Sequence, residues 1–241
     1  MFAICDKPSY YYSQVYFIYF IWKQVMTDIP DPEITPNSKA MSLRKMPNQN
    51  RSRERVENIL KCASHLIEKS GSDTMRMSDL AKMAGVSIGS LYQYFPDKAA
   101  IIQTLANRYT QEGQTCIKNA LAQVTKPDQL LLAFEALIDE YYEIFLADPV
   151  MRDVWSGMQT DVVLRENDLI ASRENAEFLA DTLKRLDKIT DQENLSAIAF
   201  MIIYLGEASM RIAIAVDKDE GQRLVNTYKR MALNELRRVT T

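Results

Sequence analysis

The chain has 241 residues, of which 47% are hydrophobic and 25% charged, a composition typical of globular proteins that bury a sizeable core. Its formal net charge of −3 hides a split, because residues 40–110 carry 11 Lys/Arg against 6 Asp/Glu, while residues 111–241 carry 15 against 22. A basic module joined to an acidic one suits a protein whose first part meets phosphate groups. The cysteines form no Cys-x-x-Cys pair, so we expect no disulfide framework, no zinc site and a reducing, cytoplasmic location.

Residues 1–50 differ in composition from the rest of the chain. Nine of the 22 aromatic residues precede residue 23, and four prolines then interrupt a polar run. The strongest apolar run, residues 15–22, is too short for a membrane span, which needs about 20 residues, and the cleavage site of a secretory signal is missing. We expect no membrane partner and interpret residues 1–50 as a disordered or non-native extension, for example from a start codon assigned too far upstream. An aromatic tail that docks on a partner or a membrane surface is the alternative.

The first convincing helix covers about residues 52–69. Apolar residues recur there at the i, i+3, i+4 spacing of an amphipathic helix, and Gly71 follows as a helix-ending residue.

Leu80, Ala81 and Ala84 lie at helical spacing after Ser78, a good N-cap, and so predict a second, short helix. Gly85 can adopt the left-handed conformation that ends this helix, and Ser87 can cap another short helix directly afterwards. Two short helices joined by such a turn form the helix-turn-helix motif, whose second helix enters the major groove of duplex DNA. The sequence therefore predicts a DNA-binding protein.

This second helix of the motif has a side to be buried and an outward side. Ile88, Leu91 and Phe95 repeat at helical spacing, and we expect all three to be buried. The outward residues are small or hydrogen-bonding, so the helix can lie close to a duplex; they are Gly89, Ser90, Tyr92 and Gln93. Of these, Gln93 can pair with the edge of an adenine.

The remainder of the chain is expected to be helical throughout. Asp97 is a good N-cap for a long helix over residues 98–121, and Pro127 stands in the first turn of the next helix, which Asp148 and Pro149 interrupt. The other expected helices cover residues 151–155, 159–186, 194–216 and 220–238. Because no stretch alternates with a period of two for long enough to predict a strand, the expected fold class is all-α.

With these residues in view, residues 51–109 resemble the tetracycline-repressor (TetR) family of bacterial transcriptional regulators. The family pattern appears here as Leu80-Ala81-Lys82, Ala84-Gly85-Val86-Ser87, Ser90-Leu91-Tyr92-Gln93-Tyr94-Phe95 and Lys98. The resemblance implies an N-terminal three-helix helix-turn-helix DNA-binding domain, residues 51–97. A helical effector-binding and dimerisation domain, residues 98–241, would follow it.

The resemblance also implies which side chains meet DNA. Residues facing the major groove or the flanking phosphates would be Ser87, Gly89, Ser90, Tyr92, Gln93 and Tyr94, and Lys98 would hold a phosphate at the start of the next helix. One of the two tyrosines could instead complete the core. Ile88 occupies a position that is often lysine or polar in the family, which puts in doubt a phosphate contact common there.

Candidate effector contacts lie in the middle helices, where aromatic residues and methionines crowd together. Core and pocket use the same residue types, so the sequence does not separate them. Arg165 and Ser172 interrupt an apolar stripe of one helix, and Glu207 lies between apolar residues of the next. A buried charge must be paired or must meet a ligand. The predicted ligand-binding residues are Tyr141, Phe145, Arg152, Trp155, Met158, Arg165, Phe178 and Glu207.

The sequence and the resemblance together predict a repressor that binds a palindromic operator as a dimer and is released by a small apolar or amphipathic effector. The long helix from Lys98 is expected to carry the signal, because it begins at the DNA contact and continues into the aromatic-rich body. The homodimer is expected to form through the last two helices, by Leu195, Ile198, Ile202 and Leu205 of one and Leu224, Tyr228, Met231 and Leu236 of the other.

The alternative is a DNA-binding regulator or architectural protein controlled by a protein partner, with no small ligand. A fully packed body would favour this alternative, whereas an apolar cavity with one or two polar groups would favour the effector. An enzyme, a cofactor or a metal is not expected, because the chain has a single histidine, His65, no glycine-rich phosphate loop and no cluster with metal-ligand spacing.

Overall fold

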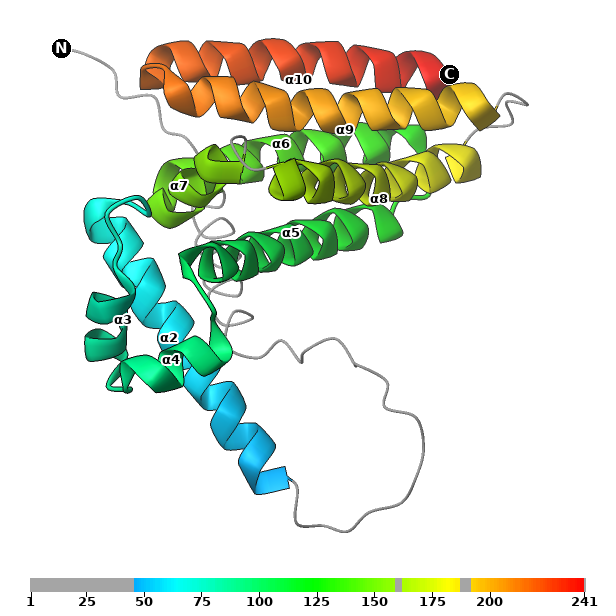
Figure 1. Ribbon diagram of the computed structural model, residues 1–241. Helices are drawn as coiled ribbons and strands as arrows, with labels where there is room; N and C mark the ends of the chain where they lie inside the picture. The colour runs from blue at the N-terminus through cyan, green and yellow to red at the C-terminus, as the bar shows by residue number, and fades with distance from the viewer. Residues whose placement is uncertain (1–45, 159–161, 187–191, 241) are drawn as a thin grey trace, which may run out of the picture. The chain divides into compact units, whose positions relative to one another are not determined.

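The computed structural model describes residues 46–158, 162–186 and 192–240. Within these ranges the chain forms nine α-helices and no strand, which confirms the all-α prediction (Figure 1). Residues 1–45, most of the predicted N-terminal extension, lie outside the described residues. The helices are α2 (Met46–Ser70), α3 (Met77–Ala84), α4 (Ile88–Tyr94), α5 (Lys98–Ala122), α6 (Pro127–Ala147), α7 (Pro149–Met158), α8 (Val162–Leu186), α9 (Gln192–Ala215) and α10 (Lys218–Thr240).

Helices α2, α3 and α4 form the helix-turn-helix unit. The turn between α3 and α4 is built as predicted, because Gly85 is left-handed with a φ of +67° and the side chain of Ser87 accepts the amide N–H of Ser90 at 3.1 Å. The side-chain amide of Asn58 in α2 donates to the carbonyl oxygen of Ala84 at 2.9 Å. This bond fastens the end of α3 to α2.

Two predictions for this unit are wrong. Ser78 does not cap α3, because the amides of Asp79 and Leu80 already donate to the carbonyl of Arg76, which takes the N-cap position without a side-chain bond. Ile88 is not buried. It is the first residue of α4, where no preceding turn covers it, and it is 44% exposed.

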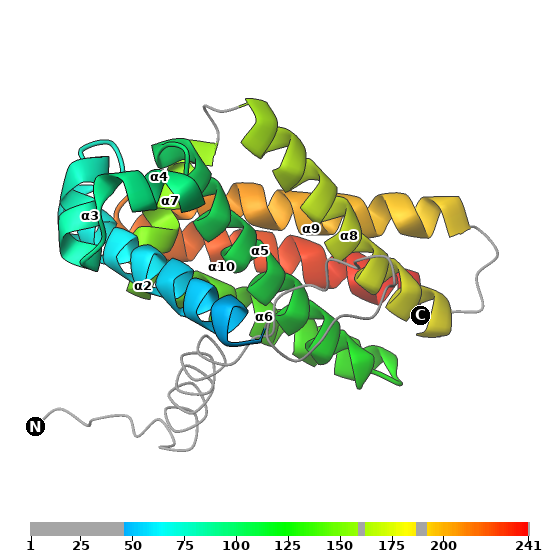
Figure 2. The same cartoon turned by 60° about the horizontal axis from the view of Figure 1, so that its bottom comes forward.

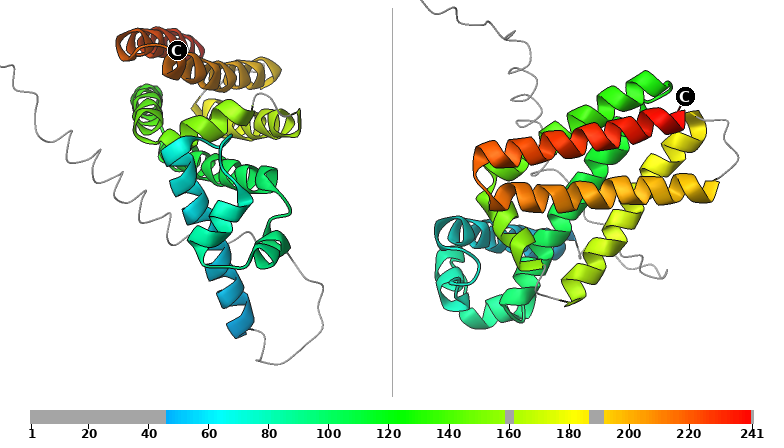
Figure 3. Two further views of the ribbon diagram at one scale, coloured as in Figure 1. Left: turned by 60° about the vertical axis from the view of Figure 1, so that its left-hand side comes forward. Right: turned by 90° about the horizontal axis from the view of Figure 1, so that it is seen from above.

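Helices α5 to α10 form a helical body (Figure 2). The side chain of Asp97 caps α5 by accepting the amide of Ala100 at 2.8 Å, and Pro127 opens α6, both as predicted. Helix α9 packs against α8 and α10, α10 packs also on α6, and α5 packs on α8. Seen from above, α9 and α10 lie side by side (Figure 3). The core of the body therefore lies between the α9–α10 layer and α5.

Two glycines allow α9 and α10 to approach closely. A Cβ atom on Gly206 would lie 2.8 Å from the hydroxyl of Tyr228, which donates to the carbonyl of Ile202 at 2.6 Å. A Cβ atom on Gly221 would lie 2.3 Å from the carbonyl oxygen of Ala213. Larger residues at either position would push the two helices apart.

Helix α9 is apolar on both of its sides. Its segment Asn194–Ala215 is long and apolar enough to cross a membrane by length and composition alone. In the structure it packs against α6, α8 and α10, as the core helix of a helical body does. Its other side leaves large apolar side chains exposed, and together with one residue of α10 they form the α9–α10 apolar face, which consists of Met201, Tyr204, Leu205, Ile212 and Met231.

Most of the residues predicted for the dimer interface lie inside the body instead. Four are buried and two half-buried: Leu195, Ile202, Tyr228 and Leu236, and Ile198 and Leu224. Only Leu205 and Met231 are exposed. Because both sides of α9 are apolar, helical spacing alone does not tell which side packs in the core and which side stays exposed.

Candidate functional site

The outward face of α4 is the candidate DNA surface. Gly89, Tyr92 and Gln93 are exposed there, whereas Leu91 on the opposite side is fully buried. Tyr92 is 49% exposed. The structure therefore places three of the predicted contacts, Gly89, Tyr92 and Gln93, on one accessible face, from which hydrogen-bonding groups can reach base edges or phosphates.

The two tyrosines of α4 have different surroundings. The hydroxyl of Tyr94 is hydrogen-bonded to Ser52 and Arg55 of α2, which lowers the pKa of Tyr94, and its side chain is half-buried. Tyr94 thus braces α4 against α2, whereas Tyr92 projects outward. A DNA contact by Tyr94 stays a prediction.

Lys98 is already engaged. Its Nζ donates to the carbonyl oxygens of Ser72 and Asp73, each at 3.0 Å, in the turn between α2 and α3. An ammonium group has three N–H donors, so one is left for the predicted phosphate contact. Lys98 therefore ties the start of α5 to the helix-turn-helix unit.

Two apolar side chains of this unit are exposed, which was not predicted from the sequence. Met83 of α3 and Ile88 of α4 are each 44% exposed. An apolar side chain at the start of a recognition helix can contact the methyl group of thymine. Because Ile88 is the first residue of α4, directly after the N-cap Ser87, its exposure could have been inferred from the sequence.

Helix α7 connects the helical body to the helix-turn-helix unit. The carboxylate of Asp153 accepts the amide N–H of Ser72 at 3.1 and 3.2 Å, in the same turn that Lys98 contacts. Arg108 of α5 also pairs with Glu57 of α2, with one N–H···O distance of 2.8 Å. The unit is therefore joined to the body through both α5 and α7.

Helix α7 is fixed to the end of α6. The carboxylate of Asp148 caps α7 by accepting the amides of Val150 and Met151 at 2.8 and 3.0 Å. Arg152, predicted to bind a ligand, instead donates to the carbonyl oxygens of Phe145 and Leu146 at 2.6 and 2.7 Å. Its guanidinium thus satisfies the C-terminal carbonyls of α6.

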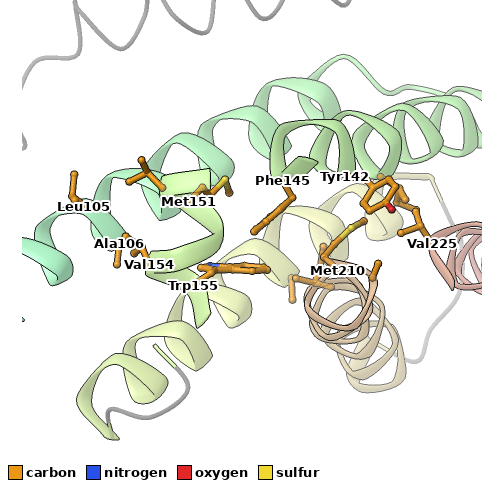
Figure 4. Close-up of a cluster of buried hydrophobic side chains, with 14 of the residues drawn as sticks. Leu105, Ala106, Tyr142, Phe145, Met151, Val154, Trp155, Met210 and Val225 are labelled. Carbon is orange, nitrogen blue, oxygen red and sulfur yellow. The ribbon is translucent and has the colours of Figure 1, made fainter. Parts of the chain in front are cut away.

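Three of the predicted ligand-binding residues form an aromatic cluster between α6 and α7. The ring of Phe145 lies 4.3 Å from that of Trp155, and both approach Tyr141 edge-on, at 5.0 and 5.9 Å between centroids. Figure 4 shows Phe145 and Trp155 near Met210 of α9. Such edge-to-face groups favour apolar and planar partners.

Polar and charged side chains of α8 and α9 adjoin these rings, and we call Asp168, Ser172, Glu207 and Arg211 the polar cluster. Arg211 lies with its guanidinium carbon 5.6 Å from the Trp155 ring centre and one nitrogen 3.7 Å from the carboxylate of Asp168. Ser172 Oγ lies 2.5 Å from Glu207 Oε2. Burial raises the pKa of Glu207 to about 7. Glu207, predicted from its apolar neighbours, is thus part of a charged group beside the aromatic cluster.

The other predicted ligand-binding residues lie elsewhere. Arg165 is exposed, and Phe178 is half-buried with the ammonium of Lys118 at 5.9 Å from its ring. The side chain of Met158 lies outside the described residues. Asp168 and Arg211 were missed, although Arg211 follows Glu207 by four positions and so shares its helix face.

A separate surface groove of about 400 Å³ runs between α8 and α9. Charged side chains line it, including Glu177, Asp181 and Lys184, and Arg173 stacks over Phe200 with its guanidinium carbon 4.8 Å from the ring centre. Its polar lining distinguishes it from the aromatic cluster.

A helix-turn-helix unit with an exposed recognition helix, joined at two places to a helical body, defines a DNA-binding regulator. The family model "Bacterial regulatory proteins, tetR family" matches residues 59–105, and the model "Tetracyclin repressor-like, C-terminal domain" matches residues 128–239. The chain belongs to the tetracycline-repressor family of bacterial transcriptional regulators, which are DNA-binding regulators and not enzymes.

Individual relatives agree with this assignment. The HTH-type transcriptional regulator EthR of Mycolicibacterium smegmatis is 23% identical over 198 residues, which cover 76% of this chain and 86% of that protein. A TetR-family transcriptional regulator from Streptomyces coelicolor has the same fold, with a TM-score of 0.58 at 20% identity over 77% of this chain and 99% of that one. The transcriptional regulator FadR from Bacillus subtilis, solved in complex with stearoyl-CoA, gives a TM-score of 0.54 at 18% identity over 75% and 96%.

Proposed function

We propose that this regulator is a cytoplasmic repressor that binds a palindromic operator as a homodimer and is released by a small apolar or amphipathic effector. One observation carries the proposal. Helix α7 carries Trp155, which is part of the aromatic cluster, and Asp153, which binds the turn between α2 and α3 of the helix-turn-helix unit. A single short helix therefore contacts both regions. A molecule that displaces Trp155 would therefore also move Asp153 and weaken its hydrogen bond to the turn that precedes α3 and α4.

The α9–α10 apolar face supports the homodimer. It presents five large apolar side chains that the body leaves exposed, and such exposed apolar side chains are typical of an interface between protein chains. Two copies joined about a two-fold axis would present two recognition helices to one duplex, which explains why a palindromic operator is expected.

The composition of the body supports an effector with an apolar part. Three aromatic rings adjoin a small set of polar groups, which is the usual lining of a small-molecule site. The FadR relative was solved with a ligand that has a long acyl chain, stearoyl-CoA. By analogy, we propose that the helical body of this chain binds the apolar chain or ring of an effector.

Operator selection tests the DNA-binding part of the proposal. The full-length chain should enrich duplexes from a random-sequence library that contain two inverted half-sites about 34 Å apart, or a multiple of that spacing. Light scattering at micromolar concentration should give a dimer. Enriched duplexes without an inverted repeat, or a monomer, would contradict the proposal. If the operator is found but no class of small molecule releases it, control by a protein partner replaces control by an effector.

A further inference from the structure

The polar cluster is not sealed like the core around it. Ser172 is fully buried, but the side chains of Asp168 and Arg211 remain 14% and 21% exposed, and Glu207 is half-buried. Leu179 and Met210 on the same two helices are essentially inaccessible. The cluster is therefore more accessible than the core residues beside it.

The hydroxyl of Ser172 can stabilise the protonated form of Glu207. Ser172 Oγ lies 2.9 Å from the carbonyl oxygen of Asp168 and 2.5 Å from Glu207 Oε2, both within hydrogen-bonding distance. A hydroxyl has a single proton, and a backbone carbonyl oxygen can only accept. When Ser172 donates to the carbonyl, the carboxyl group of Glu207 has to donate to Ser172. In this arrangement Glu207 is neutral. When Ser172 donates to Glu207 instead, the carboxylate can be ionised, and the pKa of about 7 means that both forms are populated near neutral pH.

Arg211, in contrast, has an N–H donor that lacks a hydrogen-bond acceptor. Its Nη1 is buried and has no hydrogen-bond partner among the described residues, since the carboxylate of Asp168 is 3.7 Å away. A guanidinium presents planar pairs of N–H groups that match a carboxylate, and such charged hydrogen bonds are among the strongest in proteins. The cluster therefore lacks an acceptor rather than a donor.

The charges of the cluster favour an anion over a cation. Asp168 and Arg211 form an ion pair, and Glu207 in its protonated form adds no negative charge. A ligand ammonium group would meet the positive charge of Arg211 and would find no unused anion in this state. A carboxylate would give Arg211 its missing acceptor, and the neutral Glu207 would not repel it.

We propose that Arg211 binds the carboxylate of an amphipathic organic acid whose apolar part displaces Trp155, the ring beside Arg211, from Tyr141 and Phe145. This assignment rests on the proposed effector control and specifies the chemical class of the effector. Binding requires Glu207 to stay neutral, because an ionised Glu207 would add a third carboxylate to those of Asp168 and the ligand. The affinity for the acid should therefore fall as the pH rises through about 7.

Glu207 is the group that titrates in this range. The charged and titratable groups that face it are Asp168 of α8, Arg211 of α9, Tyr141 of α6 and Tyr228 of α10. Burial raises the pKa of both tyrosines above the ordinary value for a phenol, so they stay neutral. Asp168 remains paired with Arg211.

The test uses the full-length chain with Trp22→Phe, so that Trp155 is the single tryptophan. The probes share one apolar part and differ in the head group: 4-phenylbutyrate, 4-phenylbutanol and 4-phenylbutylamine, with octanoate, octanol and octylamine as a second series. Titrations follow the fluorescence of Trp155 and the thermal midpoint. We expect the acid of at least one series to bind tenfold or more tightly than its alcohol and its amine. Between pH 6 and pH 8 its affinity should fall by about tenfold, as the neutral fraction of a group with a pKa near 7 does.

Three variants separate this role from a structural one. Arg211→Met should abolish the preference for the acid over the alcohol, while Glu207→Gln, which still donates to Ser172 and cannot ionise, should bind the acid without the pH dependence. Arg173→Met removes an arginine that stacks on an aromatic ring outside the cluster and should change neither result. The proposal is overturned if neither acid binds, if an amine or alcohol binds as tightly, or if Arg211→Met keeps the preference. Acid binding that leaves operator affinity unchanged would instead overturn effector control and leave this site standing.

Discussion

At the scale of single residues, the candidate DNA surface has two groups of side chains. One group is exposed, and the other already hydrogen-bonds within the helix-turn-helix unit. Gln93 is exposed on α4, and Tyr92 beside it projects outward. Lys98 and Tyr94 hold the unit together through bonds to the α2–α3 turn and to α2. Substitutions in the two groups should therefore differ in their effect on stability as well as on DNA binding.

Gln93→Ala is expected to weaken operator binding by about 1–3 kcal/mol and to relax the preference at one base pair, because the amide of Gln93 can pair with an adenine edge. Its unfolding midpoint should stay unchanged, since the side chain is exposed. Repeating the duplex selection with the variant gives both the affinity and the base preference. An unchanged preference at every position would exclude Gln93 as a base contact.

Lys98→Met is expected to lower the free energy of unfolding by about 1–2 kcal/mol, because two carbonyls of the α2–α3 turn lose a charged donor. It should also weaken all duplexes alike and reduce the slope of log affinity against log salt by about 0.9, since one phosphate contact is lost. Chemical unfolding and salt titrations measure the two effects. Lys82→Met, which removes an exposed charge of α3, is the control for stability. Equal stability of the two variants would rule out the role of Lys98 in the turn.

At the scale of helices, α7 is the element through which the body supports the DNA-binding unit. We expected α5 alone to carry the signal from its start at Lys98. The structure adds a second connection, because Asp153 of α7 accepts the amide of Ser72 while Trp155 of the same helix enters the aromatic cluster. Two attachments restrict the orientation of α3 and α4 more than one does.

Asp153→Ala is expected to free the α2–α3 turn, and Asp153→Asn should largely preserve it, because the amide oxygen of asparagine can still accept the N–H of Ser72. Amide hydrogen exchange at Ser72 should become at least several-fold faster in the alanine variant and change little in the asparagine variant. The alanine variant should also lose part of the release of operator by an effector. If the exchange rate at Ser72 is the same in all three proteins, α7 does not hold the turn.

The sequence predicts local features of this architecture well. Helix starts at Asp97 and Pro127, the turn at Gly85 and the cap at Ser87 depend on neighbours within four residues, and the structure confirms them. The hydrogen bond of Lys98 to Ser72 and the contacts of Arg211 with Trp155 and Asp168 join residues far apart in the chain. No spacing rule identifies such partners, and so the α7 connection and the pairing of Arg211 with Asp168 emerged only from the structure, whereas Ser172 and Glu207 were singled out from the sequence.

At the scale of the whole molecule, the α9–α10 apolar face is the proposed dimer interface. Ile212→Glu is expected to give a monomer in light scattering at micromolar concentration, because a charge would be buried in the centre of an apolar interface. Leu132→Glu is the matched control, since Leu132 of α6 is 68% exposed and lies outside this face, and it should leave the dimer intact. Monomers from both variants, or dimers from both, would place the interface elsewhere.

The central claim is that occupation of the body and binding of DNA are coupled in one dimer. The most direct measurement adds the tightest-binding organic acid to the operator complex of the Trp22→Phe chain while Trp155 fluorescence and operator anisotropy are recorded together. We predict that both signals change over the same concentration range. With coupling of about 1–3 kcal/mol, saturating acid should lower operator affinity roughly 5–150-fold, and saturating operator should lower affinity for the acid by the same factor. A saturating change in Trp155 fluorescence with unchanged operator affinity would contradict the claim.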